Sequence, residues 1–382
     1  MKTNSLRLVA LALSVLVTLG AGAQKVNKVA AMQKVGKQSV IRSTDPRLPQ
    51  TLVYFDHEVN LAEMPAEVRA FMGSYEEAVT RIENGSDPEE ILPICAATGD
   101  VTVGPILGDI EFDQGTPYND KCPVLNGGRA VTGCVATAMA EIMTFWQYPS
   151  VGKGTATYTG SRGATTYNFA DHPFDWTKIK HTYKNGNYSA QEGAAIAELM
   201  LACGASVNMN YNAAGSGANS DNVLPALRDI FGYDPAIGHL HDATDEQIAR
   251  IWVVRMKQEF DANRPVYYAG SNQTSGHAFV IDGYRTEGDV TYFHVNWGWN
   301  GNMNGWFLIS NLKPDDVNYS AYSNDCIYNI YPLGAGIDNV KNDDPARLDL
   351  TKPVYTILGT KIPAESMQRG QIYIQNGHKF VW

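Results

Sequence analysis

The feature that most constrains the fold is a row of apolar and aromatic runs in the second half of the chain. Gly, Asn and Asp residues separate the runs, which cover residues 266–269, 278–284, 291–297 and 305–309. Short runs between turn-forming residues are typical of β-strands, and close spacing favours antiparallel neighbours. Helical patterns come earlier, at 220–231 and 245–262. This order predicts an α+β domain in which a buried helix packs on a twisted antiparallel sheet.

The N-terminus has the pattern of an export signal. Lys2 and Arg7 precede an apolar run over residues 8–19, and Ala-Gly-Ala at residues 21–23 follows as a cleavage site. The run is shorter than the ~20 residues that a membrane helix needs. We therefore expect cleavage before Gln24 and a protein that is secreted, periplasmic or held at the cell surface.

Composition excludes several classes of function. The chain carries 40 Asp and Glu residues against 30 Lys and Arg, a formal net charge of -10. Such an acidic protein is not expected to bind nucleic acid, because phosphate contacts require a basic surface. No His or Cys pair has the spacing of a zinc site such as H-E-x-x-H or C-x-x-C. We expect no nucleic-acid partner, no metal and no cofactor.

Patterns along the chain predict a leader followed by a main domain. We place the leader at residues 24–100 and the main domain at residues 101–333. Within the leader, apolar residues three or four apart predict an amphipathic helix over residues 65–82, and residues 48–55 fit a strand. Small, polar and Gly-containing residues at 96–105 are typical of a linker that proteases can cut.

The C-terminal region differs in composition from the main domain. Residues 334–382 begin with a Gly- and Asp-containing linker and continue with strand patterns at 354–359 and 370–377. We expect a small β-rich tail that forms a separate module. A last hairpin of the main domain is the alternative.

Cys134 is the expected nucleophile. It follows Gly133 and begins a run whose apolar residues keep helical spacing to residue 146, so the thiol is placed at a helix N-terminus. The macrodipole and the unpaired N–H groups there favour the thiolate, and glycine allows close approach of a substrate. The total of five cysteines is odd, which leaves at least one thiol without a partner. A buried structural cysteine is the alternative, and the pairing of the other four cysteines is left open.

His277 is the expected general base. It lies between a polar loop that ends at Gly276 and an apolar strand pattern. His294 is the rival, but a histidine inside a strand is more often a core residue with satisfied hydrogen bonds. The base needs an acceptor that fixes its tautomer, and Asn296 on the following strand could supply one, with Trp297 shielding the bond from water. Core and turn packing is the alternative for these residues.

An oxyanion hole would need two hydrogen-bond donors. The backbone N–H of Cys134 is one, and the side-chain amide of Gln114 is the best-placed second donor in the sequence. A glutamine in a loop is otherwise simple polar surface.

These motifs, in this order, resemble the streptopain family of papain-like cysteine peptidases. The segments that carry the resemblance lie within residues 104–332 and comprise residues 114–119, 122–124, 133–138, 276–283 and 294–299. The resemblance implies a papain-like fold, with a central helix that carries the nucleophile packed on an antiparallel sheet. It also implies a bacterial zymogen that cuts proteins or peptides, with a preference for an apolar residue next but one before the cut bond.

The resemblance also assigns roles to individual residues. It implies Cys134 as nucleophile, His277 as base, Gln114 in the oxyanion hole, and Asn296 with Trp297 orienting the histidine. Gly276 and Gly217 are implied in substrate binding, since the loop of residues 212–220 resembles a cleft-lining loop of the family.

The leader resembles the family's pro-domain at residues 45–49 and in the helix through Tyr75, which implies that it acts as an intramolecular inhibitor. Two departures stand out. The region before it is shorter than in the family, and Phe112 replaces an expected tryptophan. The C-terminal strand patterns resemble the tails that some Gram-negative secreted proteins present to export machinery.

Two other classes of function use a similar arrangement. Transglutaminases and cell-wall amidases share the order of Cys, His and then Asn or Asp, and they attack different amides. A binding or inhibitory protein on a peptidase scaffold would keep the cleft without turnover. The Asn296-Trp297 pair favours a peptidase.

Overall fold

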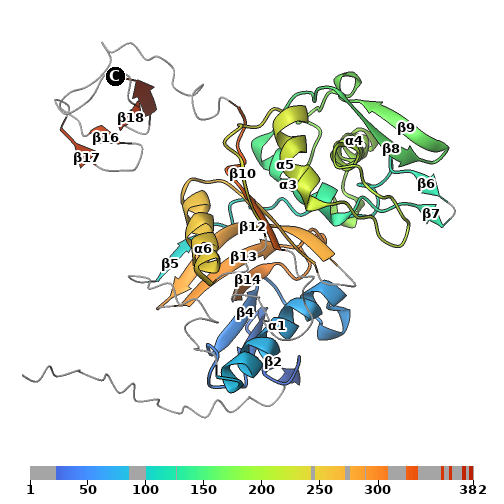
Figure 1. The fold of residues 1–382 in the computed structure, drawn as a ribbon. Coiled ribbons are helices and arrows are strands. Elements are labelled where there is room, and N and C mark those ends of the chain that lie inside the picture. Colours follow the sequence, from blue (N-terminus) through green and yellow to red (C-terminus); the bar gives the residue numbers. More distant parts are fainter. Residues whose placement is uncertain are drawn as a thin grey trace, which may run out of the picture. The chain divides into compact units, whose positions relative to one another are not determined.

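The computed structural model describes most of the chain between residues 23 and 333 and parts of the tail (Figure 1). The described residues are 23–85, 100–125, 127–241, 246–271, 276–288, 290–308, 324–333, 354–356, 361–363, 372–375 and 378–381. The export signal, Cys95, the linker before residue 100 and the linker after residue 333 lie outside them.

The chain divides into two compact units. The first comprises Met1–Gln114, His181–Gly186 and Leu240–Cys326, and the second comprises Gly115–Lys180, Asn187–His239 and Ile327–Trp382. Each unit is assembled from segments that are far apart in the sequence, so the division does not follow the predicted boundary between leader and main domain. Among the described residues, no helix is both long and apolar enough to cross a membrane.

The first unit is built on one large sheet. Its strands run in the order β1-β2-β3-β4-β14-β13-β12-β11-β15-β10, and β5 pairs with β12. The pairings from β11 to β14 are antiparallel, as the sequence predicted. The strands are β1 (Gln24–Lys25), β2 (Ala30–Val35), β3 (Gln38–Ser43), β4 (Thr51–Phe55), β5 (Val101–Val103), β10 (Gly238–His241), β11 (Val266–Ser271), β12 (Gly276–Glu287), β13 (Val290–Asn296), β14 (Gly305–Leu308) and β15 (Asn324–Tyr328).

The centre of this sheet is apolar on both faces. Eight consecutive residues of β12 are buried, which explains why its sequence is a continuous apolar run rather than an alternating pattern. Helix α6 (Glu246–Asp261), which the sequence predicted at 245–262, contacts β12. The β12–β13 register shifts between Ile281 and Gly283, where a bulge bends the strand.

The leader adds strands and a helix to this sheet. Strand β4 pairs with β14, with Tyr54 opposite Trp306. Helix α1 (Ala66–Glu83) confirms the predicted amphipathic helix and ends at Asn84. Its apolar side is buried, and the hydroxyl of Tyr75 donates to the carbonyl oxygen of Leu308 at 2.7 Å. Leader and catalytic strands thus share one core.

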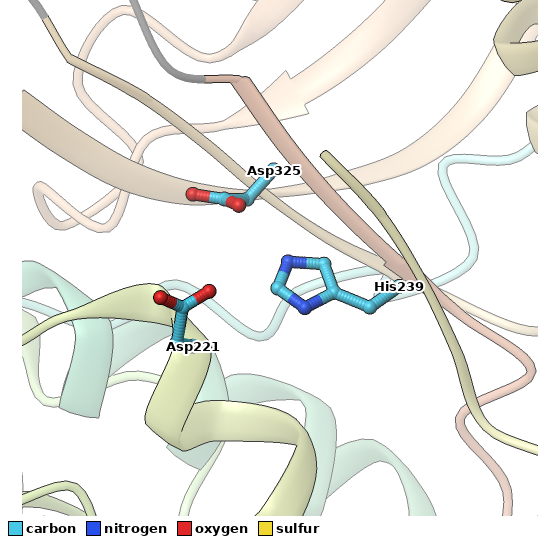
Figure 2. A group of neighbouring side chains, drawn as sticks. All are labelled: Asp221, His239 and Asp325. Atoms are coloured by element: carbon cyan, nitrogen blue, oxygen red, sulfur yellow. The ribbon is translucent and has the colours of Figure 1, made fainter. Parts of the chain in front are cut away.

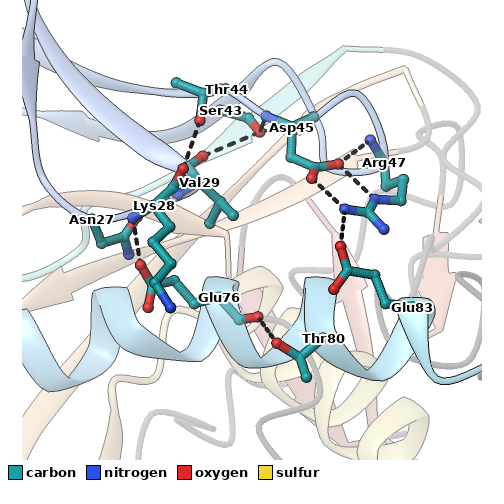
Figure 3. Close-up of polar contacts among 10 residues, drawn as sticks. All are labelled: Asn27, Lys28, Val29, Ser43, Thr44, Asp45, Arg47, Glu76, Thr80 and Glu83. Carbon is teal, nitrogen blue, oxygen red and sulfur yellow. Dashed lines mark hydrogen bonds and ion pairs between the residues drawn. The ribbon is translucent and has the colours of Figure 1, made fainter.

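Polar contacts hold the leader's loops to α1 (Figure 3). Arg47 bridges Asp45 and Glu83, at 2.5 and 2.8 Å. The backbone N–H of Lys28 donates to the Glu76 carboxylate. Of the strands before α1, the sequence predicted the one at residues 48–55, which is β4, whereas β1, β2 and β3 were not predicted.

The second unit is mainly helical. Helix α3 (Cys134–Trp146) has the bounds that the sequence predicted, and it packs against α4 (Ala190–Ser206). The predicted helix at 220–231 is irregular and divides into η4 (Ser220–Asn222), α5 (Val223–Pro225) and η5 (Ala226–Ile230). Two hairpins complete the unit: β6 (Val124–Leu125) with β7 (Gly128–Arg129), and β8 (Thr155–Gly160) with β9 (Gly163–Asn168).

The strands of the tail pair with one another. Their order is β17-β16-β18-β19, an antiparallel sheet of four strands among the described tail residues. The strands are β16 (Val354–Thr356), β17 (Lys361–Ile362), β18 (Ile372–Gln375) and β19 (His378–Val381). These strands overlap the strand patterns of the tail, and its status as a separate module stays a prediction.

Phe307 offers a test of the shared core. It is fully buried and makes edge contacts with Phe55 and Phe71 of the leader and with Trp297. We expect Phe307→Ala to lower the free energy of unfolding by about 3–5 kcal/mol, because a large cavity remains. Phe307→Leu fills more of the space than alanine does, so its free energy of unfolding should fall by less. Urea unfolding monitored by tryptophan fluorescence measures both, and equal midpoints for all three proteins would contradict the shared core.

Candidate active site

His277 lies at the start of β12 and is held by aromatic rings. It is the second residue of the strand, opposite Gly270 of β11. Only 8% of its surface is exposed. The ring of Trp299 stacks on the imidazole with centroids 4.4 Å apart, and Trp297 and Phe279 lie nearly parallel to it at 6.0 and 6.1 Å. These contacts fix the plane of the imidazole.

One hydrogen bond fixes the tautomer of His277. Its Nε2 lies 2.9 Å from the carbonyl oxygen of Trp297. A carbonyl can only accept, so Nε2 carries the hydrogen and Nδ1 of the neutral ring is left as the acceptor. Burial lowers the pKa of His277 to about 4, although this hydrogen bond and the charge of Glu67 act in the opposite direction. The imidazole is therefore neutral at pH 7.

Asn296 lies beside this site but contacts other groups. Its Nδ2 donates to the carbonyl oxygen of Ile110 at 2.8 Å, and its Oδ1 accepts from the N–H of Gly298 at 3.2 Å. These bonds shape the turn whose Trp297 carbonyl accepts from His277. In this arrangement Asn296 orients the histidine only through the turn, and its predicted direct role stays a prediction.

His294, the rival base, is enclosed by two carboxylates. Its Nδ1 lies 2.5 Å from Asp282 and its Nε2 lies 2.9 Å from Asp56. Burial would lower the pKa of His294, but the two carboxylates outweigh it and raise the pKa to about 10. Both ring nitrogens are occupied, so neither is available to a thiol.

Cys134 differs from the other described cysteines. It is half-buried at the first position of α3, whereas Cys122, Cys203 and Cys326 are buried thiols. Burial raises the pKa of all three, that of Cys122 to about 12. A thiol with a raised pKa carries little thiolate and reacts slowly.

Position 133 requires glycine for a structural reason as well as for substrate access. Its φ is +85°, a conformation that other residues rarely adopt. A Cβ at this position would lie 2.7 Å from Sδ of Met209 and 3.0 Å from the carbonyl oxygen of Ser216. The protein's own packing therefore requires glycine before the predicted nucleophile.

The remaining predicted residues lie in both units. Gln114 is half-buried in the first unit, and its backbone N–H donates to Asp113 at 2.6 Å. Gly276 is exposed at the start of β12. Gly217 is exposed in the second unit, where it exchanges backbone hydrogen bonds with Asn210.

The first unit brings part of the predicted site together. His277, Asn296 and Trp297 are neighbours there, whereas Cys134 belongs to the second unit. The pairing of Cys134 with His277 stays a prediction. Two contributors to the histidine's surroundings were not assigned a role from the sequence: Trp299, which stacks on the ring, and Glu67 of α1. The spacing of Trp297 and Trp299, two residues apart, was the available signal.

A group of side chains that could ligate a metal lies apart from the predicted catalytic residues in the sequence (Figure 2). Ligand atoms of Asp221 and His239, both in the second unit, lie within 4.8 Å of each other. Asp325, also drawn in Figure 2, is assigned to the first unit. Two side chains are too few to hold an ion, so this group supports no metal site within either unit.

A cysteine at a helix N-terminus and a buried histidine on an antiparallel sheet are the elements of a papain-like cysteine peptidase, and the comparisons with known proteins identify this class. The sequence profile of the Peptidase C10 family matches residues 112–307, and the chain belongs to this family. Streptopain of Streptococcus pyogenes is 33% identical over 298 residues, which are 72% of this chain and 72% of streptopain. The thiol protease/hemagglutinin PrtT of Porphyromonas gingivalis is 32% identical over 83% of this chain, which spans only 37% of the length of PrtT.

Solved structures confirm the fold. A fragment of prointerpain A from Prevotella intermedia matches with a TM-score of 0.67 and 26% identity, covering 81% of this chain and 98% of that one. The active wild-type interpain A cysteine protease of the same organism matches with a TM-score of 0.51 and 33% identity, covering 64% of this chain and 98% of that one. The resemblance predicted from the motifs is thereby confirmed.

The burial of His277 leads to a prediction about its protonation. Trp299→Ala should admit water to the imidazole, so the pKa of His277 should rise from about 4 towards 6.5. NMR titration of the imidazole protons in a Cys134→Ala background measures this pKa, and Trp176→Ala, in the other unit, should leave it unchanged. Because the folded pKa is the lower one, His277 contributes stability above pH 6.5 that is lost as the pH falls towards 4. A pKa that stays near 4 in Trp299→Ala would contradict this account.

Proposed function

We propose that the protein is a secreted cysteine endopeptidase in which Cys134 is the nucleophile and His277 the general base and acid. The observation that carries the assignment is the contrast among the cysteines. Cys134 is half-buried at a helix N-terminus, and the three other described thiols are buried with raised pKa values. Membership of a cysteine peptidase family supplies the reaction class.

The reaction follows from these groups. His277 takes the proton of the Cys134 thiol, and the thiolate attacks the carbonyl carbon of the substrate. The C–N bond of the tetrahedral intermediate then breaks as the imidazolium of His277 gives this proton to the leaving amine. This leaves a thioester on Cys134. His277 then takes a proton from water, the hydroxide attacks the thioester, and the acid product leaves as the thiol is restored. The N–H of Cys134 and the amide of Gln114 would stabilise the oxyanion in both steps.

The nucleophile is tested by substitution and labelling. Cys134→Ser should abolish casein hydrolysis, because a serine hydroxyl has a far higher pKa than a thiol and is not ionised here. Iodoacetamide should label wild type at Cys134 and inactivate it stoichiometrically, and Cys203→Ser, which changes a buried thiol, should remain active and be labelled. Hydrolysis by Cys134→Ser at the wild-type rate would overturn the mechanism. Transfer of a primary amine to casein in place of hydrolysis would favour the transglutaminase alternative.

We also infer that the leader keeps the enzyme latent. In support, its strand β4 extends the catalytic sheet at β14, and Phe71 of α1 packs on Trp297 with ring centroids 5.9 Å apart. Trp297 supplies the carbonyl that binds His277. The pKa of about 4 for His277 disfavours the imidazolium that a thiolate–imidazolium pair requires. Prointerpain A also matches more of this chain than active interpain A does.

A charge cluster centred on the buried His294 favours docking of the leader. Asp56 is the only one of its three members that the leader supplies, and it closes a carboxylate–imidazole–carboxylate bridge through His294 to Asp282. Its backbone N–H also donates to the carbonyl oxygen of Asn304 at 3.0 Å. Asp282 and Asp56 raise the pKa of His294 to about 10, so the imidazole is charged at pH 7 and its ion pair with Asp56 is lost only as the pH rises through about 10.

Asp56→Asn tests this docking. The substitution keeps the shape and removes the charge, and we expect the active enzyme to appear about tenfold faster, as the loss of one charge-assisted hydrogen bond implies. The time course of chain shortening on gels and of peptide hydrolysis measures it. Glu58→Gln is the matched control, since Glu58 is a leader carboxylate in an exposed pair with Lys34. Equal maturation rates for the two variants would argue against the bridge, and an active enzyme with its N-terminus intact at Gln24 would refute latency.

Specificity and export follow from the family resemblance. We infer a preference for an apolar residue next but one before the cut bond, with Gly217 and Gly276 near the substrate, and export through the N-terminal signal. The separate tail sheet supports a role of the C-terminus in sorting. A peptide library varied at that one substrate position measures the preference directly.

A further inference from the structure

The surface loop of residues 210–217 in the second unit contains one buried polar side chain, that of Ser216. Asn210 and Gly217 exchange backbone hydrogen bonds of 2.9 and 3.2 Å and so close the loop. Between them, Asn212 and Gly215 are exposed, whereas Ser216 is only 9% exposed. A serine that is buried within an otherwise exposed loop must use its hydroxyl in hydrogen bonds.

The hydroxyl of Ser216 reaches the segment that leads into α3. Its Oγ lies 2.7 Å from the carbonyl oxygen of Val131 and accepts from the N–H of Asn212 at 2.9 Å. The carbonyl oxygen of Asn212 is farther from it, at 3.1 Å, so the single hydroxyl hydrogen is directed to Val131. The N–H of Val131 in turn donates to the carbonyl oxygen of Asn212 at 3.3 Å. Both the N–H and the carbonyl oxygen of Val131 are therefore hydrogen-bonded to the loop.

The same loop contacts the residue before Cys134. The carbonyl oxygen of Ser216 lies 3.0 Å from the position that a Cβ on Gly133 would occupy. Ser216 thus holds the segment through its hydroxyl at Val131, and its carbonyl leaves no room for a side chain at position 133. Gly133 contributes no side-chain cap to α3, so the entry into the helix depends on the Ser216 hydroxyl and on Thr137, whose hydroxyl donates to the carbonyl oxygen of Gly133 at 3.1 Å.

We propose that Ser216 is a positioning residue for Cys134. Its hydroxyl holds residues 131–133 so that the thiol and the N–H of Cys134 are directed at the substrate carbonyl together. The inference rests on the proposed role of Cys134 as nucleophile. Alignment of this kind is demanding, because a displacement of about 1 Å can cost about a hundredfold in rate.

The experiment compares two serines with equally short bonds. Ser206 donates to the carbonyl oxygen of Cys203 at 2.7 Å, the same distance as Ser216 to Val131, but within α4. Ser216→Ala, Ser216→Thr and Ser206→Ala are made in the full chain, brought to the same extent of chain shortening on gels, and assayed for peptide hydrolysis. Labelling with iodoacetamide at about pH 6, where an ordinary thiol with a pKa of about 8.5 carries little thiolate, counts the activated thiols, so kcat is expressed per labelled Cys134 of the folded enzyme.

We expect kcat per labelled thiol to fall about tenfold or more in Ser216→Ala, with KM within about twofold of wild type and with the hydroxyl of Ser216→Thr restoring most of the rate. Ser206→Ala should match wild type. A kcat in Ser216→Ala equal to wild type, a rise in KM alone, or an equal loss in Ser206→Ala would each overturn the proposal. If Cys134→Ala still hydrolyses peptide, the nucleophile assignment fails instead, and the two failures are distinguishable.

Discussion

The antiparallel pairing of β12 with β13 is the constraint on which the first unit depends. It sets Val280 opposite Asn296, so the turn that follows β13 returns beside the start of β12, where His277 lies. The carbonyl of Trp297 then reaches Nε2, and Trp299 covers the ring. A slip of one residue would turn every side chain of the strand to the other face and would separate the imidazole from its acceptor.

The leader and the catalytic strands use the same aromatic core. Phe71 of α1 contacts both Trp297 and Phe307, and Phe55 of β4 contacts Phe307. Trp297 therefore has two roles: its ring contacts the leader, and its backbone carbonyl orients His277. Removal of the leader would change the surroundings of His277 without any change in the rest of the sequence, which would give the proposed latency a physical basis at the histidine.

Periodicity in the sequence predicted the elements with a clear apolar pattern. Helix α3 has the predicted bounds, and the strands from β11 to β14 follow the apolar runs. Helix α4 was missed although Ser189 and Glu192 form a capping box, because small apolar residues surround the helix and leave no amphipathic stripe. Within the site, residue types indicated His277, but its acceptor is the backbone of Trp297, and a carbonyl has no signature in the sequence.

Strand β14 lies between β13 and β4, and only the leader supplies the second of these neighbours. Without β4, the outer edge of β14 would present unpaired N–H and C=O groups, which is a template for any extended chain. A catalytic domain produced without residues 24–85 would carry this open edge from the moment it folds. The leader therefore covers a strand edge that could otherwise pair with a second copy of the chain.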